Sequence, residues 1–109
     1  MARPSLAAAL LAVLVLAGCQ GAGKRMTLEE FNTFCNDQFA WNEDCDSGDI
    51  CQSFRSALSQ EHSGRAACHA ACNKVDTAQW MENVMTSCAA TVGNASDWCE
   101  QYCNRKYPK

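Results

Sequence analysis

The cysteines are the feature that most constrains how this chain can fold. Nine cysteines occur in 109 residues, and eight of them lie in the 83 residues of segment 27–109. A domain of that size has a marginal apolar core, so covalent cross-links commonly supplement it. Cysteine near a tenth of the residues is typical of a disulfide scaffold. The eight are Cys35, Cys45, Cys51, Cys68, Cys72, Cys88, Cys99 and Cys103. Their even number suits a framework of disulfides, whereas Cys19 requires a separate explanation.

The segment before Cys19 has the features of an export signal. Arg3 and the amino terminus supply positive charge, and residues 6–16 form an unbroken apolar run. That run is shorter than the roughly 20 apolar residues that a membrane-spanning helix needs. It matches the apolar region of a secretory signal peptide. The tetrapeptide LAGC at 16–19 resembles the lipobox of bacterial lipoproteins.

The lipobox resemblance implies a diacylglyceryl group on the Cys19 thiol and removal of residues 1–18 by the lipoprotein signal peptidase. A further acyl chain such as palmitate on the new amino group would give stable anchoring, because a single chain holds a protein only marginally. Residues 19–26 would then be the lipidated cysteine and a tether. Gln20 stands where an Asp would favour retention at the inner membrane, so the outer membrane facing the periplasm is favoured. The alternatives are an ordinary signal peptide and a buried helix that contains a cysteine by chance.

The charge balance argues against a nucleic-acid partner. Arg3 is the only Lys or Arg within 1–18, so the mature chain has eight basic residues against twelve acidic ones, a net charge of −4. No basic patch is present for phosphate contacts. The expected partners are the membrane, through the lipid, and an envelope protein.

Helical periodicity dominates the first half of segment 27–109. Thr27 and Glu30 form a capping box, in which each side chain pairs with the backbone amide of the other residue. Apolar residues then recur at helical spacing, at Leu28, Phe31, Cys35 and Phe39, with Phe34 beside them. This first helix should end near Trp41. A second helix from about Asp49 to Ser63-Gly64 presents one apolar face, with Ile50, Cys51, Phe54 and Leu58.

The second half predicts further short helices. We expect one at 65–74 and another at 77–92, with Gly93 as its C′ residue. A last helix from about Ser96 to Pro108 would have acidic residues in its first turn and basic residues in its last, namely Asp97, Glu100, Arg105 and Lys106. No segment has the alternation of a strand. The fold class is therefore all-α, a small disulfide-stapled domain of four to five short helices.

Two C-x-x-x-C segments restrict the disulfide pairing. Cysteines four apart on one helix have Cβ atoms about 5–6 Å apart, whereas a disulfide needs about 3.5–4.5 Å. Each pair should therefore bond to another helix. If the two helices are antiparallel, the pairs are Cys68–Cys103 and Cys72–Cys99. This arrangement resembles the twin C-x-x-x-C hairpins of small mitochondrial import chaperones, in those four cysteines only. The three possible pairings of Cys35, Cys45, Cys51 and Cys88 stay open.

The remaining motifs do not indicate a catalytic or metal site. A thiol oxidoreductase would be expected to have a C-x-x-C motif beside a βαβ pattern, and this sequence has neither. The C-x-x-x-C spacing suits zinc, but export to an oxidising compartment favours disulfides. His62 and His69 have no acid or nucleophile partner in the sequence, and the acidic segment 42–49 fails the calcium-loop pattern. Trp80 and Trp98 are expected in the core. No cofactor is predicted.

Together these observations predict a lipid-anchored cell-envelope protein that is not an enzyme. It would act as a binding or structural module. The alternative is a small envelope enzyme, or a thiol-redox or metal-binding protein.

Overall fold

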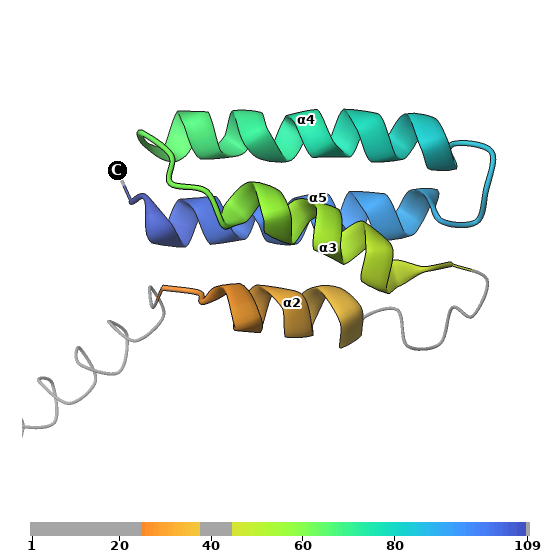
Figure 1. The fold of residues 1–109 in the computed structure, drawn as a ribbon, viewed down its shortest axis with the longest axis horizontal. Helices are drawn as coiled ribbons and strands as arrows, with labels where there is room; N and C mark the ends of the chain where they lie inside the picture. The colour runs from red at the N-terminus through yellow and green to blue at the C-terminus, as the bar shows by residue number, and fades with distance from the viewer. Residues whose placement is uncertain (1–24, 38–44, 109) are drawn as a thin grey trace, which may run out of the picture.

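The computed structural model describes residues 25–37 and 45–108 of the chain. The described residues form four α-helices and no strand, which confirms an all-α domain (Figure 1). The helices are α2 (Leu28–Asp37), α3 (Ser47–Leu58), α4 (Arg65–Asn83) and α5 (Ala89–Lys106). The predicted signal segment 1–18 and Cys19 lie outside the described residues, as do Phe39 and Trp41.

Two helices at the centre of the domain separate the other two. α3 and α5 pack against each other, and both α2 and α4 pack on this pair. Figure 1 shows α2 and α4 at opposite edges, with α4 and α5 running antiparallel as a hairpin. α4 is thus an edge helix whose neighbours are α3 and α5.

The first two helices begin close to where the sequence predicted them, but the predicted end of the second at Ser63-Gly64 is wrong. α3 ends at Leu58. The next three residues, 59–61, are polar and exposed, so no apolar side chain continues the inward stripe. The Glu30 amide donates to Thr27 Oγ1 at 3.1 Å, and the Thr27 amide donates to Glu30 Oε1 at 3.3 Å, so the capping box is present. In α3, the Asp46 side chain accepts from the Asp49 amide at 3.0 Å and starts the helix slightly earlier than expected. The inward stripes of both helices are buried, with Phe31, Cys35, Ile50, Cys51, Phe54 and Leu58.

The predicted break between residues 74 and 77 is wrong. α4 runs without interruption from Arg65 to Asn83. The chain then turns at residues 84–88, so the predicted continuous helix 77–92 is also wrong. No Gly or Pro interrupts α4 between residues 74 and 77. Val75 lies one turn beyond Cys72 on the inward face and packs against the core, which favours continuation.

Gly93 does not end a helix. It lies within α5, which extends to Lys106, so the predictions of a C′ residue at Gly93 and a new helix at Ser96 are wrong. The helix continues because Val92, Ala95 and Ser96 are buried on its inward face. The first turn of α5 consequently carries no acidic residue. The last turn carries Arg105 and Lys106, as expected from the helix dipole.

Candidate functional site

Four disulfides connect the eight cysteines of the domain. Two of them, Cys68–Cys103 and Cys72–Cys99, join α4 to α5 in the pairing that antiparallel helices require. The two pairs that the sequence left open are Cys35–Cys51, which joins α2 to α3, and Cys45–Cys88. Their Cα atoms are 5.4 to 5.9 Å apart, within the usual range for disulfides.

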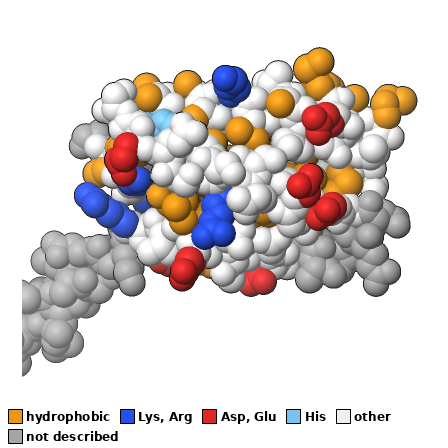
Figure 2. All heavy atoms as spheres, in the orientation of Figure 1, with side chains coloured by type: hydrophobic (Ala, Val, Ile, Leu, Met, Phe, Trp, Pro, Cys, Tyr) orange, Lys and Arg blue, Asp and Glu red, His pale blue; other side chains and the backbone are white. Residues whose placement is uncertain are grey.

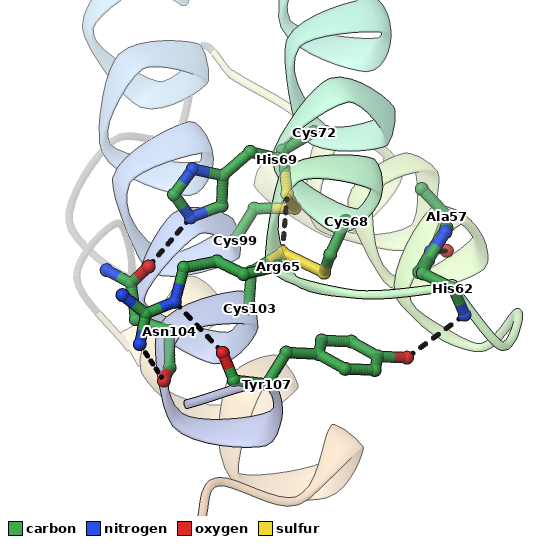
Figure 3. Close-up of a disulfide and its surroundings, with 10 residues drawn as sticks. All are labelled: Ala57, His62, Arg65, Cys68, His69, Cys72, Cys99, Cys103, Asn104 and Tyr107. Carbon is green, nitrogen blue, oxygen red and sulfur yellow. Dashed lines mark hydrogen bonds between the residues drawn. A yellow bond between two sulfur atoms is a disulfide. The ribbon is translucent and has the colours of Figure 1, made fainter. Parts of the chain in front are cut away.

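The two hairpin disulfides lie in contact with each other. The Sγ atoms of Cys72 and Cys103, which belong to different disulfides, are 3.6 Å apart (Figure 3). Because neither sulfur carries a proton, this is a packing contact and not a hydrogen bond. All four cysteines are fully buried. The cluster therefore joins the two helices and presents no thiolate for redox chemistry or metal binding.

A polar network closes the end of the hairpin where α4 begins and α5 ends (Figure 3). Arg65 donates from Nε to the Tyr107 carbonyl at 2.9 Å and from Nη2 to the Asn104 carbonyl at 3.1 Å. These carbonyls belong to the end of α5, where helix geometry leaves acceptors without partners. The positive charge also suits the dipole at this end. Arg65 is thus a C-terminal cap supplied by a different helix.

The two histidines take part in the same structural network. Tyr107 Oη accepts from the His62 amide at 3.0 Å, and His62 Nε2 donates to the Ala57 carbonyl at 2.9 Å. His69 Nε2 lies 2.7 Å from Asn104 Oδ1. Neither ring lies beside a carboxylate or a nucleophile in these contacts. The contacts fit surface and packing roles for both histidines and suggest no acid–base pair.

Lys106 forms the ion pair among the described residues. Its Nζ lies 3.2 Å from Glu61 Oε1, and the Glu61 side chain is largely exposed. Partial burial lowers the pKa of Lys106. The hydrogen bond to Glu61 and the nearby charges of Tyr102, Tyr107 and Glu61 outweigh that effect, so the pKa lies above its ordinary value. The pair links the segment between α3 and α4 to the last turn of α5.

The described residues show neither a pocket nor a cluster of metal-ligating side chains. They hold no group of three or more His, Cys, Asp or Glu side chains that could bind a metal ion. None of the described helices is long and apolar enough to span a membrane. The distinctive feature of the described residues lies on their outer surface.

One part of that surface is unusually apolar. Four large hydrophobic side chains are exposed at the end of α4 and in the turn that follows: Trp80 at 50%, Met81 at 70%, Val84 at 41% and Met85 at 92%. In Figure 2 hydrophobic side chains protrude at the upper right, where Figure 1 shows this end of the hairpin. Contiguous exposed apolar groups commonly mark an interaction site. We call these four residues the apolar tip.

The two tryptophans that the sequence assigned to the core behave differently. Trp98 packs against the core and stacks on Phe34, with ring centroids 4.8 Å apart. Trp80 is half exposed, so its assignment to the core is wrong. Trp80 lies 12 residues beyond Cys68 on α4, and the helical twist turns it away from the inward stripe of Cys68, Cys72 and Val75. The sequence did not predict the apolar tip, because the predicted helix ended at residue 74 and the outward face of α4 could not be followed beyond it.

Comparison of the chain with protein-family models, curated proteins and solved structures found no match. The functional interpretation therefore depends on the chemistry of the residues themselves.

Proposed function

We propose that this protein is a lipid-anchored protein of the bacterial cell envelope that acts as a non-catalytic binding module. The observation that supports the anchor is the cysteine balance. The four disulfides pair eight cysteines with one another, and the remaining one is Cys19. Cys19 is also the cysteine of the LAGC tetrapeptide that resembles a lipobox. A cysteine outside the framework is thus found at the position where lipidation would occur.

The absence of Asp after Cys19 supports the outer membrane, facing the periplasm, as the location. Gln20 occupies that position. In such a compartment disulfides form and persist, which agrees with the pairing of the cysteines in the domain. The anchor would keep a small acidic domain at the membrane surface.

A binding role is supported by the apolar tip. Trp and Met are enriched at the centres of protein interfaces. The tip exposes Trp80 and Met81 on a helix that disulfides hold in place, and Met85 in the turn that follows. A thiol-redox or metal-binding role receives less support. The cysteines that it would use are cross-linked and buried.

The anchor is tested by Cys19→Ala in the full chain, expressed in a bacterium that processes lipoproteins. The native chain should fractionate with the outer membrane and yield an N-terminal peptide that begins at residue 19 and carries lipid mass. Cys19→Ala should lose the lipid and appear in the soluble envelope fraction. Gln20→Ala is the matched control, because it retains LAGC and should stay acylated. A Cys19→Ala variant that keeps the same lipid mass would refute the anchor.

The binding role is tested by capture from solubilised envelope membranes with the mature, oxidised protein as bait. A specific partner should be retained by the native protein and by Gln101→Glu, which adds a charge at an exposed site on α5. Met85→Glu, which adds the same charge within the apolar tip, should lose that partner. Equal retention by both variants would exclude the tip as the binding surface.

A further inference from the structure

We propose that the outer face of α4 binds the same face of a second copy of this chain, with the two helices antiparallel. Six residues define this face, which we call the α4 stripe: Ala66, Ala70, Asn73, Thr77, Trp80 and Val84. All six are exposed. They follow one another in alternating steps of four and three residues, the spacing of the contact positions in a coiled coil. The inference rests on the proposed binding role and identifies the partner.

The α4 stripe is not needed by the fold of one copy. Cys68, Cys72 and Val75 face the core from the other side of the helix, where α4 meets α3 and α5. A helix that is hydrophobic all round is normally buried on all sides, and the outer side of α4 exposes Trp80 and Val84. Nothing among the described residues covers the outer face of α4. Its charged residues Lys74, Asp76 and Glu82 lie off the stripe, because none of them falls on the four-and-three spacing.

The sizes of the side chains select a second, antiparallel copy. The stripe is small at one end, with Ala66 and Ala70, and large at the other, with Trp80 and Val84. In an antiparallel pair centred between Asn73 and Thr77, Trp80 of each copy lies opposite Ala70 of the other. Val84 likewise lies opposite Ala66. A parallel pair would place Trp80 against Trp80 and leave the alanine ends apart, so only the antiparallel pair fills the space evenly.

The two-fold symmetry makes every contact occur twice. An interface of this kind uses the same patch on both copies and closes at two subunits. Asn73 would meet Thr77 of the second copy on both sides of the symmetry axis. A single polar residue at such a position commonly sets the register of paired helices. The stripe is therefore self-complementary in size and in polarity.

The exposed apolar area approaches what a small dimer interface needs. At roughly 200 Å² for each large side chain, the exposed fractions of the apolar tip correspond to about 500 Å² in one copy. Complete burial of the tip in both copies would remove about 1,000 Å² from water, near the lower limit for a specific interface. The exposed Ala66, Ala70, Asn73 and Thr77 add to this area. Met81 and Met85 flank the stripe, and their flexible side chains can fill the margin.

Electrostatic attraction does not drive this pairing. Lys74 and Asp76 lie on opposite sides of the stripe close to its centre. In the antiparallel pair each Lys74 is therefore near the Lys74 of the other copy, and each Asp76 is near the other Asp76. Salt screens such repulsion between exposed charges. The dimer should accordingly be unchanged or tighter at higher ionic strength, whereas a pair held by opposite charges would weaken.

A size exchange tests both the partner and the orientation. The mature, acylated protein is studied in mild detergent by sedimentation, with Trp80→Ala, Ala70→Trp and the double variant that combines them. Trp80→Ala removes the large group, and Ala70→Trp places two indoles in one space. Each should weaken dimerisation at least about tenfold, a difference of about 1.4 kcal/mol. The double variant restores large opposite small and should return close to native affinity. Gln52→Trp on the exposed face of α3 is the matched control and should have no effect.

A photoreactive residue in place of Thr77 gives an independent measurement in intact membranes. It should yield an adduct of two copies, joined near the middle of α4. The same probe in place of Gln101 should not. Three results would each overturn the inference. The native protein could stay monomeric, or the double variant could dimerise as weakly as either single variant. The probe at position 77 could also form adducts only with lipid or with another protein. Unchanged helicity and disulfide maps show that the variants are folded.

The outcome is separable from that of the anchor experiment. Dimerisation of Cys19→Ala would support the α4 interface even if no lipid were found on the native chain. An acylated protein that remains monomeric would overturn the interface and leave the anchor standing.

Discussion

α3 and α4 are held in the same domain by different means. α3 has 12 residues, of which four are buried, and they form a continuous inward stripe of Ile50, Cys51, Phe54 and Leu58. α4 has 19 residues, and its two buried residues are Cys68 and Cys72. The shorter helix is thus held mainly by the burial of apolar side chains, with one disulfide, Cys35–Cys51, joining it to α2. The longer one is held mainly by covalent bonds.

This difference explains how α4 can expose large apolar groups. A helix that depends on hydrophobic burial must direct such side chains inward. Disulfides instead stabilise a fold mainly by restricting the unfolded chain, and those at Cys68 and Cys72 close loops with sequence separations of 35 and 27. The Trp and Met side chains of α4 are then available for contacts outside the domain. The comparison of α3 with α4 gives four predictions, in decreasing order of effect.

The largest effect is expected from removing both hairpin disulfides. Replacing Cys68, Cys72, Cys99 and Cys103 by Ala should unfold the domain or detach α4. Each disulfide contributes about 2–5 kcal/mol, against a total of about 5–15 kcal/mol for a typical domain. Circular dichroism and hydrogen exchange along α4 would measure the loss. Exchange protection of α4 at the native level would show that apolar packing, and not the disulfides, holds this helix.

Phe54→Ala should have the next largest effect. Phe54 is fully buried on α3, and a buried Phe→Ala change typically costs about 3–5 kcal/mol. Val75→Ala on α4 is the comparison, and its cost should be clearly smaller because Val75 is only partly buried. Urea denaturation of the oxidised variants would give both values. Equal costs at the two positions would remove the proposed distinction between the helices.

Arg65→Ala should have a smaller effect, at the hairpin end away from the apolar tip. It removes two hydrogen bonds to the carbonyls of Asn104 and Tyr107 and leaves those acceptors to water. Since the network is partly exposed, we expect a loss of about 1–2 kcal/mol. Exchange of the last amides of α5 should increase most. Arg55→Ala on α3 is the matched control, because its side chain makes no hydrogen bond among the described residues, and it should change these amides little.

Lys106→Met should change stability least. The pair with Glu61 is largely exposed, and such pairs contribute about 0–1 kcal/mol. Because the pKa of Lys106 is raised in the folded state, the contribution is present below the ordinary lysine pKa and is lost as pH rises through the folded value. Native and variant stabilities should therefore converge at strongly alkaline pH. A difference that grows with pH in that range would contradict this assignment.

The parts of the fold that local patterns determine could be predicted from the sequence. The capping box at Thr27, the inward face of α3 and the all-α class each depend on residues close together in the chain. The bonds of Cys68 and Cys72 to α5 followed from helix geometry once an antiparallel arrangement was assumed. The C-terminal cap by Arg65 could not be found in this way, because its acceptors lie 39 and 42 residues away.

The apolar tip and the α4 stripe were missed for a related reason. A predicted break at 75–76 divided the stripe between two helices, so its regular spacing from Ala66 to Val84 could not be recognised. The sequence positions of the paired cysteines indicate where the turn between α4 and α5 lies. The midpoint of Cys68 and Cys103, and that of Cys72 and Cys99, both fall between Met85 and Thr86, within the observed turn. Use of both disulfides together would have located the end of α4.

The sequence by itself determined that this chain forms helices, that its domain is cross-linked by disulfides, and that Cys19 stands apart from the other eight cysteines. These properties follow from side-chain periodicity, domain size and residue counts, which need no knowledge of distant contacts. The tertiary structure alone decided which cysteines join α2 to α3 and residue 45 to residue 88, and it directed Trp80 outward. Those outcomes depend on how the helices pack, because an apolar side chain is buried only if a neighbouring helix covers the face on which it lies.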